Sequence, residues 1–174
     1  MHEKGFSLIE LLTTLALLAV LLPLSSAGLD RLLTANRQQD AAQLLASGLR
    51  SARAAAILHQ HTALIHGLDD DWSRGWRIIL DISGKGQADP ENPLLVERRS
   101  NGQVRIVGNR PVQHFVRFSA QGSPLLPSGA FQAGTLHVCQ NDHLRGRHQV
   151  VLSRSGRVSL RSDLAEQALC AATG

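Results

Sequence analysis

Glu10 is the one acid in the apolar segment that spans residues 6–29, and its chemistry is the most restrictive in the chain. A carboxylate held in hydrocarbon costs at least about 2.5 kcal/mol, so such acids are rare and face a partner. An ammonium group in the same apolar surroundings would offset the desolvation of both charges. We therefore interpret Glu10 as one half of a buried ion pair, in preference to a chance acid in a simple anchor.

A second chemical feature is a block of positive charge between Asp142 and Asp163. It contains arginines and histidines and no acid: Arg145, Arg147, Arg154, Arg157, Arg161, His143 and His148. In an extended strand Arg157, Ser159 and Arg161 share one face, which suits contacts with the phosphates of double-stranded DNA. Such contacts would be independent of sequence and weakened by salt. A solvated basic edge, or a contact with an acidic partner subunit, explains the same residues equally well.

The two cysteines, Cys139 and Cys170, stand far apart and in no metal-ligand spacing. A structural disulfide between them is the simplest interpretation. It requires an oxidising compartment such as a periplasm, and the loop it closes would stabilise the fold by about 3 to 4 kcal/mol.

Other patterns of catalytic or metal-binding residues are weak. His59 and His61 have no third ligand nearby, and the stretch 81–86 with Asp89 lacks the ligand order of a calcium loop. The chain contains no nucleophile elbow, zinc-protease motif or phosphate-binding glycine loop. We therefore predict no enzymatic activity, no metal and no cofactor. The formal charge of +4 and the pI near 10 permit binding to a polyanion.

The segment 6–29 must position Glu10, and its length and apolarity predict a helix that crosses a bilayer. The short leader with Lys4 would stay cytoplasmic and the bulk of the chain would be exported. Residues 25–27 also resemble a signal peptidase site, with cleavage before Gly28. That cleavage would release a periplasmic binding module, whereas retention of the segment would leave the chain anchored in a membrane.

Apolar residues continue at helical spacing beyond this segment, for example at Leu45, Leu49 and Ala52. Residues 30–60 therefore predict an amphipathic helical half whose apolar face packs on a sheet. Together with residues 6–29 they would form one helix about 80 Å long.

Residues 61–174 predict a β-rich domain. Turn residues such as Asn101-Gly102 and Ser155-Gly156 separate short β-like runs. We predict strands at 62–66, 76–82, 94–98, 104–107, 112–118, 135–139, 149–153 and 157–160. The predicted fold class is α+β, with a long N-terminal helix, partly transmembrane, packed on an antiparallel β-sheet domain.

The N-terminal sequence Lys4-Gly5-Phe6-Ser7-Leu8-Ile9-Glu10 resembles the class III signal of type IV pilins and type II secretion pseudopilins. The resemblance implies that a prepilin peptidase removes residues 1–5 by cutting after Gly5 and methylates Phe6. It also implies that Glu10, then the fifth residue, neutralises the α-amino group of a neighbouring subunit as that subunit leaves the membrane for the filament.

Three further motifs resemble the GspH/FimT-type pseudopilins in the same order along the chain. They are the W-x-x-G-W pattern at residues 72–76, the F-x-x-x-G pattern at 118–122 and the S-G-R-V pattern at 155–158. Some members of this group bind DNA through a C-terminal Gly-Arg-x-Arg motif. Gly156 and Arg157 match its start, but Ser159 stands where the second arginine would be, and Arg161 follows two residues later.

The resemblance therefore implies a minor pilin of a type IV pilus, with a single pass through the inner membrane and its C-terminal domain in the periplasm. The implied partners are the prepilin peptidase, other pilins or pseudopilins and, through the basic block, double-stranded DNA during natural transformation. A pseudopilin of a type II secretion system is the leading alternative. The periplasmic module released at Gly28 is the second.

Overall fold

The longest element is the helix α1 (Leu8–Leu58), which has 51 residues. The computed structural model describes residues 7–140, 143–162 and 168–171, without the side chains of residues 18, 20–28, 31, 140, 143–147, 168 and 171. By its contacts the chain divides into residues 1–37 and 38–174, and α1 contributes to both. The predicted long helix is confirmed, and its expected first residue, Phe6, lies outside the described residues.

The first turn of α1 begins at Ser7, whose carbonyl accepts the N–H groups of Glu10 and Leu11 at 3.0 and 3.2 Å. The hydroxyls of Thr13 and Thr14 donate to the Glu10 carbonyl, so these polar side chains are satisfied by the helix itself. Among the residues that the structure describes, no helix combines the length and the apolarity that a bilayer crossing needs.

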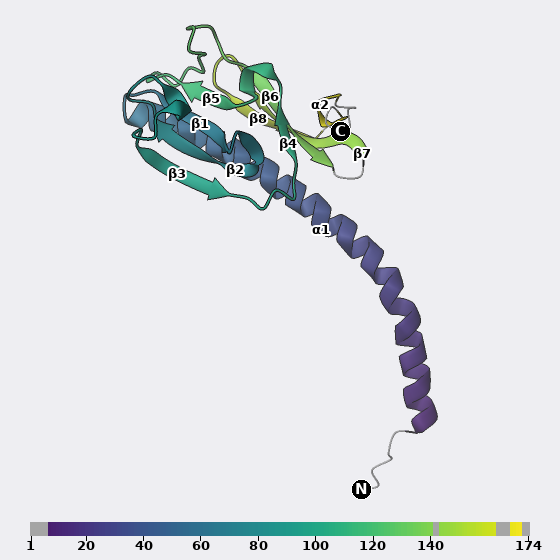
Figure 1. The fold of residues 1–174 in the computed structure, drawn as a ribbon. Helices are drawn as coiled ribbons and strands as arrows, with labels where there is room; N and C mark the ends of the chain where they lie inside the picture. The colour runs from purple at the N-terminus through teal and green to yellow at the C-terminus, as the bar shows by residue number, and fades with distance from the viewer. Residues whose placement is uncertain (1–6, 141–142, 163–167, 172–174) are drawn as a thin grey trace. The chain divides into compact units, whose positions relative to one another are not determined.

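The strands form two antiparallel sheets within residues 38–174 (Figure 1). One sheet has the order β3-β2-β1-β5 and the other has the order β4-β6-β7-β8. In chain order the described elements are β1 (Ala63–Leu68), β2 (Asp71–Leu80), η1 (Gly86–Ala88), β3 (Leu94–Arg99), β4 (Ile106–Gly108), η2 (Arg110–Val112), β5 (Phe115–Phe118), β6 (Gly134–Gln140), β7 (His143–Leu152), β8 (Val158–Arg161) and α2 (Ala168–Ala171).

Each predicted strand corresponds to a strand of the structure, but β2 and β7 begin several residues earlier than predicted, and β5 begins three residues later because residue 112 belongs to η2. The two early starts lie beside a shift in pairing register, at Gly67/Leu68 for β2 and within residues 138–140 for β7. Such irregularities interrupt the alternation of buried and exposed side chains on which the strand prediction depends. In β2, for example, Trp72 and Ser73 are adjacent and both buried.

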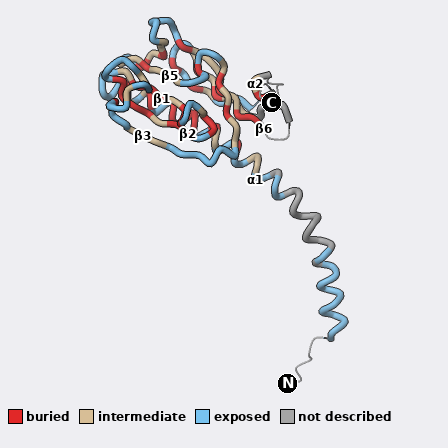
Figure 2. Tube along the Cα trace, viewed as in Figure 1, coloured by how far each residue is buried: buried red, intermediate tan, exposed pale blue. Residues whose placement is uncertain are grey.

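The second part of α1 supplies a face of small and medium apolar residues to a core shared with both sheets. Leu45, Leu49 and Ala52 are at most 1% exposed, as the predicted stripe requires, and Figure 2 shows the buried residues gathered in the domain that the two sheets form. Gly48 lets the ring of Trp76 lie against the helix backbone, because a Cβ at this position would come within 2.7 Å of that ring. The W-x-x-G-W motif therefore builds the contact between helix and sheet.

The loop between β2 and β3 is organised by the buried carboxylate of Asp81. One oxygen accepts the Gly86 N–H at 2.8 Å, and the other lies 3.5 Å from Arg117 of β5. Asn92 also fastens the loop, since its amide donates to the Gly86 carbonyl at 2.9 Å. The carboxylate of Asp81 and the amide of Asn92 thus hold this glycine-rich loop in place through the backbone of Gly86.

Candidate functional site

Glu10 lies in the first turn of α1 with its side chain exposed. Leu8, Ile9 and Leu11 are also more than half exposed, so the acid and a surrounding apolar surface are presented together. Within the described residues the Glu10 carboxylate forms no ion pair. The two predicted processing residues, Gly5 and Phe6, lie outside the described residues.

Two turns that are far apart in the sequence meet at Arg53 of α1. Its Nε donates to the Gly122 carbonyl at 3.0 Å and its Nη1 to the Gly156 carbonyl at 3.4 Å. Both glycines are buried with φ values of 75° and 78°, where other residues are strained. A Cβ on Gly156 would also lie 2.9 Å from the Gly122 oxygen. The F-x-x-x-G and S-G-R-V motifs therefore form one structural joint around a single guanidinium group.

Arg50 precedes Arg53 by three residues on the same side of α1. It contacts the β7–β8 hairpin at the outer side of β8, the last strand of its sheet. Its Nη2 donates to the Val158 carbonyl at 3.2 Å. The turn is closed by the Ser153 N–H, which donates to the Arg157 carbonyl, and by the Arg157 N–H, which donates to Ser153 Oγ. The Gly156-Arg157 pair thus belongs to a tight turn that is held against the helix.

The predicted DNA-binding arginines are only partly brought together. Arg154 and Arg157 are exposed in the turn between β7 and β8, while Arg161 is exposed at the end of β8. Arg161 follows Arg157 by four positions, which is about 13 Å in an extended chain. The backbones of Arg145 and Arg147 lie in β7, and their side chains lie outside the described residues.

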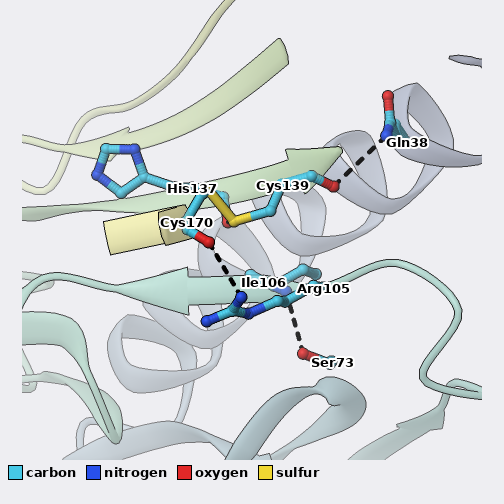
Figure 3. Close-up of a disulfide and its surroundings, with 7 residues drawn as sticks. All are labelled: Gln38, Ser73, Arg105, Ile106, His137, Cys139 and Cys170. Atoms are coloured by element: carbon cyan, nitrogen blue, oxygen red, sulfur yellow. Dashed lines mark hydrogen bonds between the residues drawn. A yellow bond between two sulfur atoms is a disulfide. The ribbon is translucent and has the colours of Figure 1, made fainter. Parts of the chain in front are cut away.

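The predicted disulfide between Cys139 and Cys170 is present and joins β6 to α2 (Figure 3). The two Cα atoms are 5.6 Å apart, within the range that disulfides bridge. Arg105 donates to the Cys170 carbonyl at 3.0 Å, and the buried amide of Gln38 donates to the Cys139 carbonyl at 3.4 Å. The covalent bond therefore lies where α1, the turn end of the β6–β7 hairpin and α2 meet.

A polar cleft of about 940 Å³ opens where the chain crosses from one sheet to the other. It is lined by residues from the β1–β2 turn, from β2, from the loop after β3 and from β4, among them Asp69, Arg74, Arg99 and Arg105. The ion pair between Arg74 and Asp69 is 2.8 Å long, but both side chains are more than 60% exposed. Such a pair is worth at most about 1 kcal/mol and is readily exchanged for another partner.

Sequence reasoning missed Arg50, Arg53 and the cleft arginines. The two helix arginines lie off the predicted apolar stripe, yet each donates to a carbonyl of the β-domain. One signal is available in the sequence. Arg50 and Arg53 are three residues apart and lie next to the apolar stripe, so both border the face of the helix that packs on the sheets. The cleft arginines come from separate strands, and no local pattern connects them.

Comparison with protein families identifies the chain. Residues 41–156, two thirds of the sequence, match the family model described as type II transport protein GspH. The chain belongs to the GspH family. Residues 1–22 of this GspH-family protein match the model described as the prokaryotic N-terminal methylation motif. That match contains Gly5, Phe6 and Glu10, and the two models together confirm the resemblance drawn from the leader and the three motifs.

Solved structures with the same fold include two crystal structures of the type IV minor pilin FimU from Pseudomonas aeruginosa strain PAO1. The first is 23% identical, covers 78% of this chain and 96% of the FimU chain, and has a TM-score of 0.60. The second is 24% identical, covers 76% and 98%, and has a TM-score of 0.58. At this identity the likeness establishes the fold, and it confirms the predicted α+β pilin-like class. No curated protein sequence gives a significant match.

Proposed function

We propose that this GspH-family protein is a minor pilin, a low-abundance subunit of a type IV pilus that helps to initiate or cap the filament. The observation that carries the proposal is the methylation motif at residues 1–22 directly upstream of the GspH domain at residues 41–156. A prepilin peptidase removes residues 1–5, and the mature chain begins at methylated Phe6. The chain is then held in the inner membrane by residues 6–29, with residues 61–174 in the periplasm.

In this proposal Glu10 provides the assembly contact. Its carboxylate pairs with the α-amino group of a neighbouring subunit, because either charge alone would be desolvated among the apolar helices. The exposure of Glu10 together with Leu8, Ile9 and Leu11 supports this role, since the acid is presented on an apolar surface. The pair also fixes the axial register between subunits.

Mass spectrometry of the mature protein tests the processing step. We expect a chain that begins at N-methylated Phe6. A chain that begins at Gly28 would overturn the proposal and favour the released periplasmic module. The Glu10→Gln variant tests the ion pair: we expect normal processing but loss of the subunit from sheared pili, with Thr14→Val on the same helix as the control.

A pseudopilin of a type II secretion system is the second candidate, and the description of the matching family model favours it. The two candidates differ in the assembly that depends on the subunit. Deletion of the gene should reduce surface pili and twitching if the protein is a minor pilin. A secretion defect with normal pili would instead assign it to the pseudopilus.

We further propose that the basic block contacts double-stranded DNA through phosphates. Arg154, Arg157 and Arg161 are all exposed on the β7–β8 hairpin, and no acid occurs between Asp142 and Asp163. Because Arg53 and Arg50 hold this hairpin, its cations are presented on a fixed backbone. The contacts are independent of DNA sequence, and their strength falls steeply as salt is raised.

The Arg157→Ala/Arg161→Ala double variant tests this contact at low salt. We expect its gel-shift midpoint to rise several-fold, whereas the Arg98→Ala/Arg99→Ala variant, which removes the same charge from β3, should shift it much less. Equal midpoints for the two double variants would show that only net charge matters. An unchanged midpoint in the first variant would remove the DNA contact from the proposal.

A further inference from the structure

Three of the four outer edges of the two sheets accept or donate hydrogen bonds on their outer side to other parts of the described chain. At β5 both backbone groups of Arg117 are bonded, the N–H to the Gln132 side chain at 2.9 Å and the carbonyl to the Leu125 N–H at 3.0 Å. At β4 the Ile106 N–H donates to the Ser73 hydroxyl at 3.0 Å. At β8 the Val158 carbonyl accepts from Arg50.

The fourth edge, β3, is open. The Ser100 N–H donates to the Arg74 carbonyl of β2 at 2.8 Å, and this bond fixes the alternation along the pair. Arg98 therefore turns its backbone groups toward β2, while Glu97 and Arg99 turn theirs outward. No other backbone segment among the described residues is hydrogen-bonded to that outer side. Figure 1 shows β3 along the outside of its sheet, and Figure 2 shows most of it as exposed.

The side chains of β3 change character along the strand. Leu94 and Val96, at its start, are 53% and 37% exposed, which is unusual for apolar residues on an open edge. Arg98 and Arg99, at its end, are exposed. The intervening Glu97 is already shared by two guanidinium groups, those of Arg77 and Arg99, at 3.1 and 2.7 Å. The edge is thus apolar at one end and cationic at the other.

The cleft of about 940 Å³ continues from the cationic end of β3, since Arg99 lines it together with Arg74 and Arg105. The exposed Arg74–Asp69 ion pair is weak, so the Arg74 guanidinium can exchange Asp69 for a carboxylate of another protein. Side chains that extend beyond the end of β3 would therefore meet the guanidinium groups that line this open cleft.

A second copy of this chain does not complement the edge. Antiparallel pairing of two β3 strands must set the outward residues Glu97 and Arg99 opposite one another. The registers that do so place Glu97 opposite Glu97, Arg98 opposite Arg98 or Arg99 opposite Arg99, and parallel pairing would also place arginine opposite arginine. The outward N–H and C=O groups require a polypeptide backbone as their partner. The complementary segment is one whose apolar residues meet Leu94 and Val96 and whose carboxylates meet Arg98, Arg99 and the cleft.

We propose that the outer edge of β3 binds an extended segment of a different protein subunit, which adds a strand to the sheet and places acidic side chains at the cleft. The source of the segment rests on the proposed function, since a filament subunit has other pilins or pseudopilins as neighbours. The docking itself depends only on the backbone, apolar and charge pattern of β3.

The experiment uses the full chain in detergent and a labelled synthetic peptide, Glu-Glu-Thr-Val-Thr-Val-Thr, which in antiparallel pairing places its two acids opposite Arg99 and Arg98 and its valines opposite Val96 and Leu94. Fluorescence anisotropy should show binding at least tenfold tighter than that of the counterpart Lys-Lys-Thr-Val-Thr-Val-Thr. The Leu94→Thr/Val96→Thr variant should weaken binding of the acidic peptide about tenfold, whereas Leu160→Thr on the β8 edge should not. Arg99→Glu should reverse the preference between the two peptides.

A version of the acidic peptide that is N-methylated at its third residue, which lies opposite the outward-facing Glu97, tests the strand addition itself, because it cannot donate to the Glu97 carbonyl. We expect at least a tenfold loss. Equal binding of the two charged peptides, or unchanged binding after N-methylation, would overturn the proposal. A concentration-dependent dimer that disappears in the Leu94→Thr/Val96→Thr variant would also overturn it, because a second copy would then occupy the edge. A failure of the peptide-binding test would not change the expected methylation of Phe6, so the strand-addition proposal and the proposed function can be refuted independently.

Discussion

Replacement of Arg53 by methionine tests the joint at which the helix and two turns of the β-domain meet. Methionine keeps most of the apolar stem and removes the guanidinium, which donates to the buried carbonyls of Gly122 and Gly156 at 3.0 and 3.4 Å. A hydrogen bond from a charged donor contributes about 1.5 to 3 kcal/mol, and a buried carbonyl left without a partner costs about 1 to 3 kcal/mol. Because the second bond is long, we expect a total loss of about 2 to 4 kcal/mol.

Arg50→Met provides the matched comparison on the same helix. It removes one bond, to the Val158 carbonyl at 3.2 Å, so the expected loss is about 1 to 2 kcal/mol. For a domain of this size each kcal/mol lowers Tm by about 3 to 5 °C. Thermal unfolding followed by the fluorescence of the buried Trp72 and Trp76 should therefore show a decrease of about 10 °C for Arg53→Met and about 5 °C for Arg50→Met.

The order of the two variants is the decisive result. If Arg53→Met lowers Tm by no more than Arg50→Met, the two-carbonyl joint does not hold the turns and the explanation of Gly122 and Gly156 fails. Arg53→Lys gives an internal check, since a single ammonium lacks the fork that reaches both carbonyls. We expect its Tm between those of the parent and Arg53→Met.

Three further predictions concern the core and the covalent bond. Replacing Cys139 and Cys170 with serine should lower the unfolding free energy by about 3 to 4 kcal/mol, because the bond spans 31 residues, and the same loss should follow reduction by dithiothreitol. Gly48→Ala should destabilise by about 1 to 2 kcal/mol in chemical denaturation despite better helix propensity, because the new Cβ would overlap the Trp76 ring. Burial lowers the pKa of His66 below its ordinary value of 6.5, so the unfolded state binds the proton more readily. Stability should therefore fall as the pH drops below about 7, and Tm measured from pH 7.5 to 5 should depend less on pH in His66→Asn.

The sequence predicted the elements of this fold well because their periodicities are strong. The apolar stripe through Leu45 and Leu49 follows the helical period, and both residues are buried in the core. The division of the strands into two sheets was not predicted, because strand order depends on long-range pairing such as that of β4 with β6. The early starts of β2 and β7 were missed because register shifts disturb the alternation there.

The candidate sites were predictable only where chemistry is local. Glu10 stands out as an acid in an apolar run, and the pairing of Cys139 with Cys170 follows from their number and spacing. Arg53 gives only the weak signal of its position beside the apolar stripe, since an arginine that reaches backbone carbonyls 69 and 103 residues away looks much the same in sequence as a solvated one. The open edge of β3 likewise becomes visible only once the neighbours of every strand are known.

The bond between Cys139 and Cys170 also determines how the domain bears mechanical load. Cys139 lies in β6, an inner strand of its sheet, whereas β7 and β8 lie between the two cysteines in sequence. A pull on the C-terminal end therefore reaches β6 through the sulfur bridge and bypasses the hairpin, which cannot be peeled from the sheet strand by strand. Under reducing conditions the same pull would act on α2 and then on β8, the edge strand.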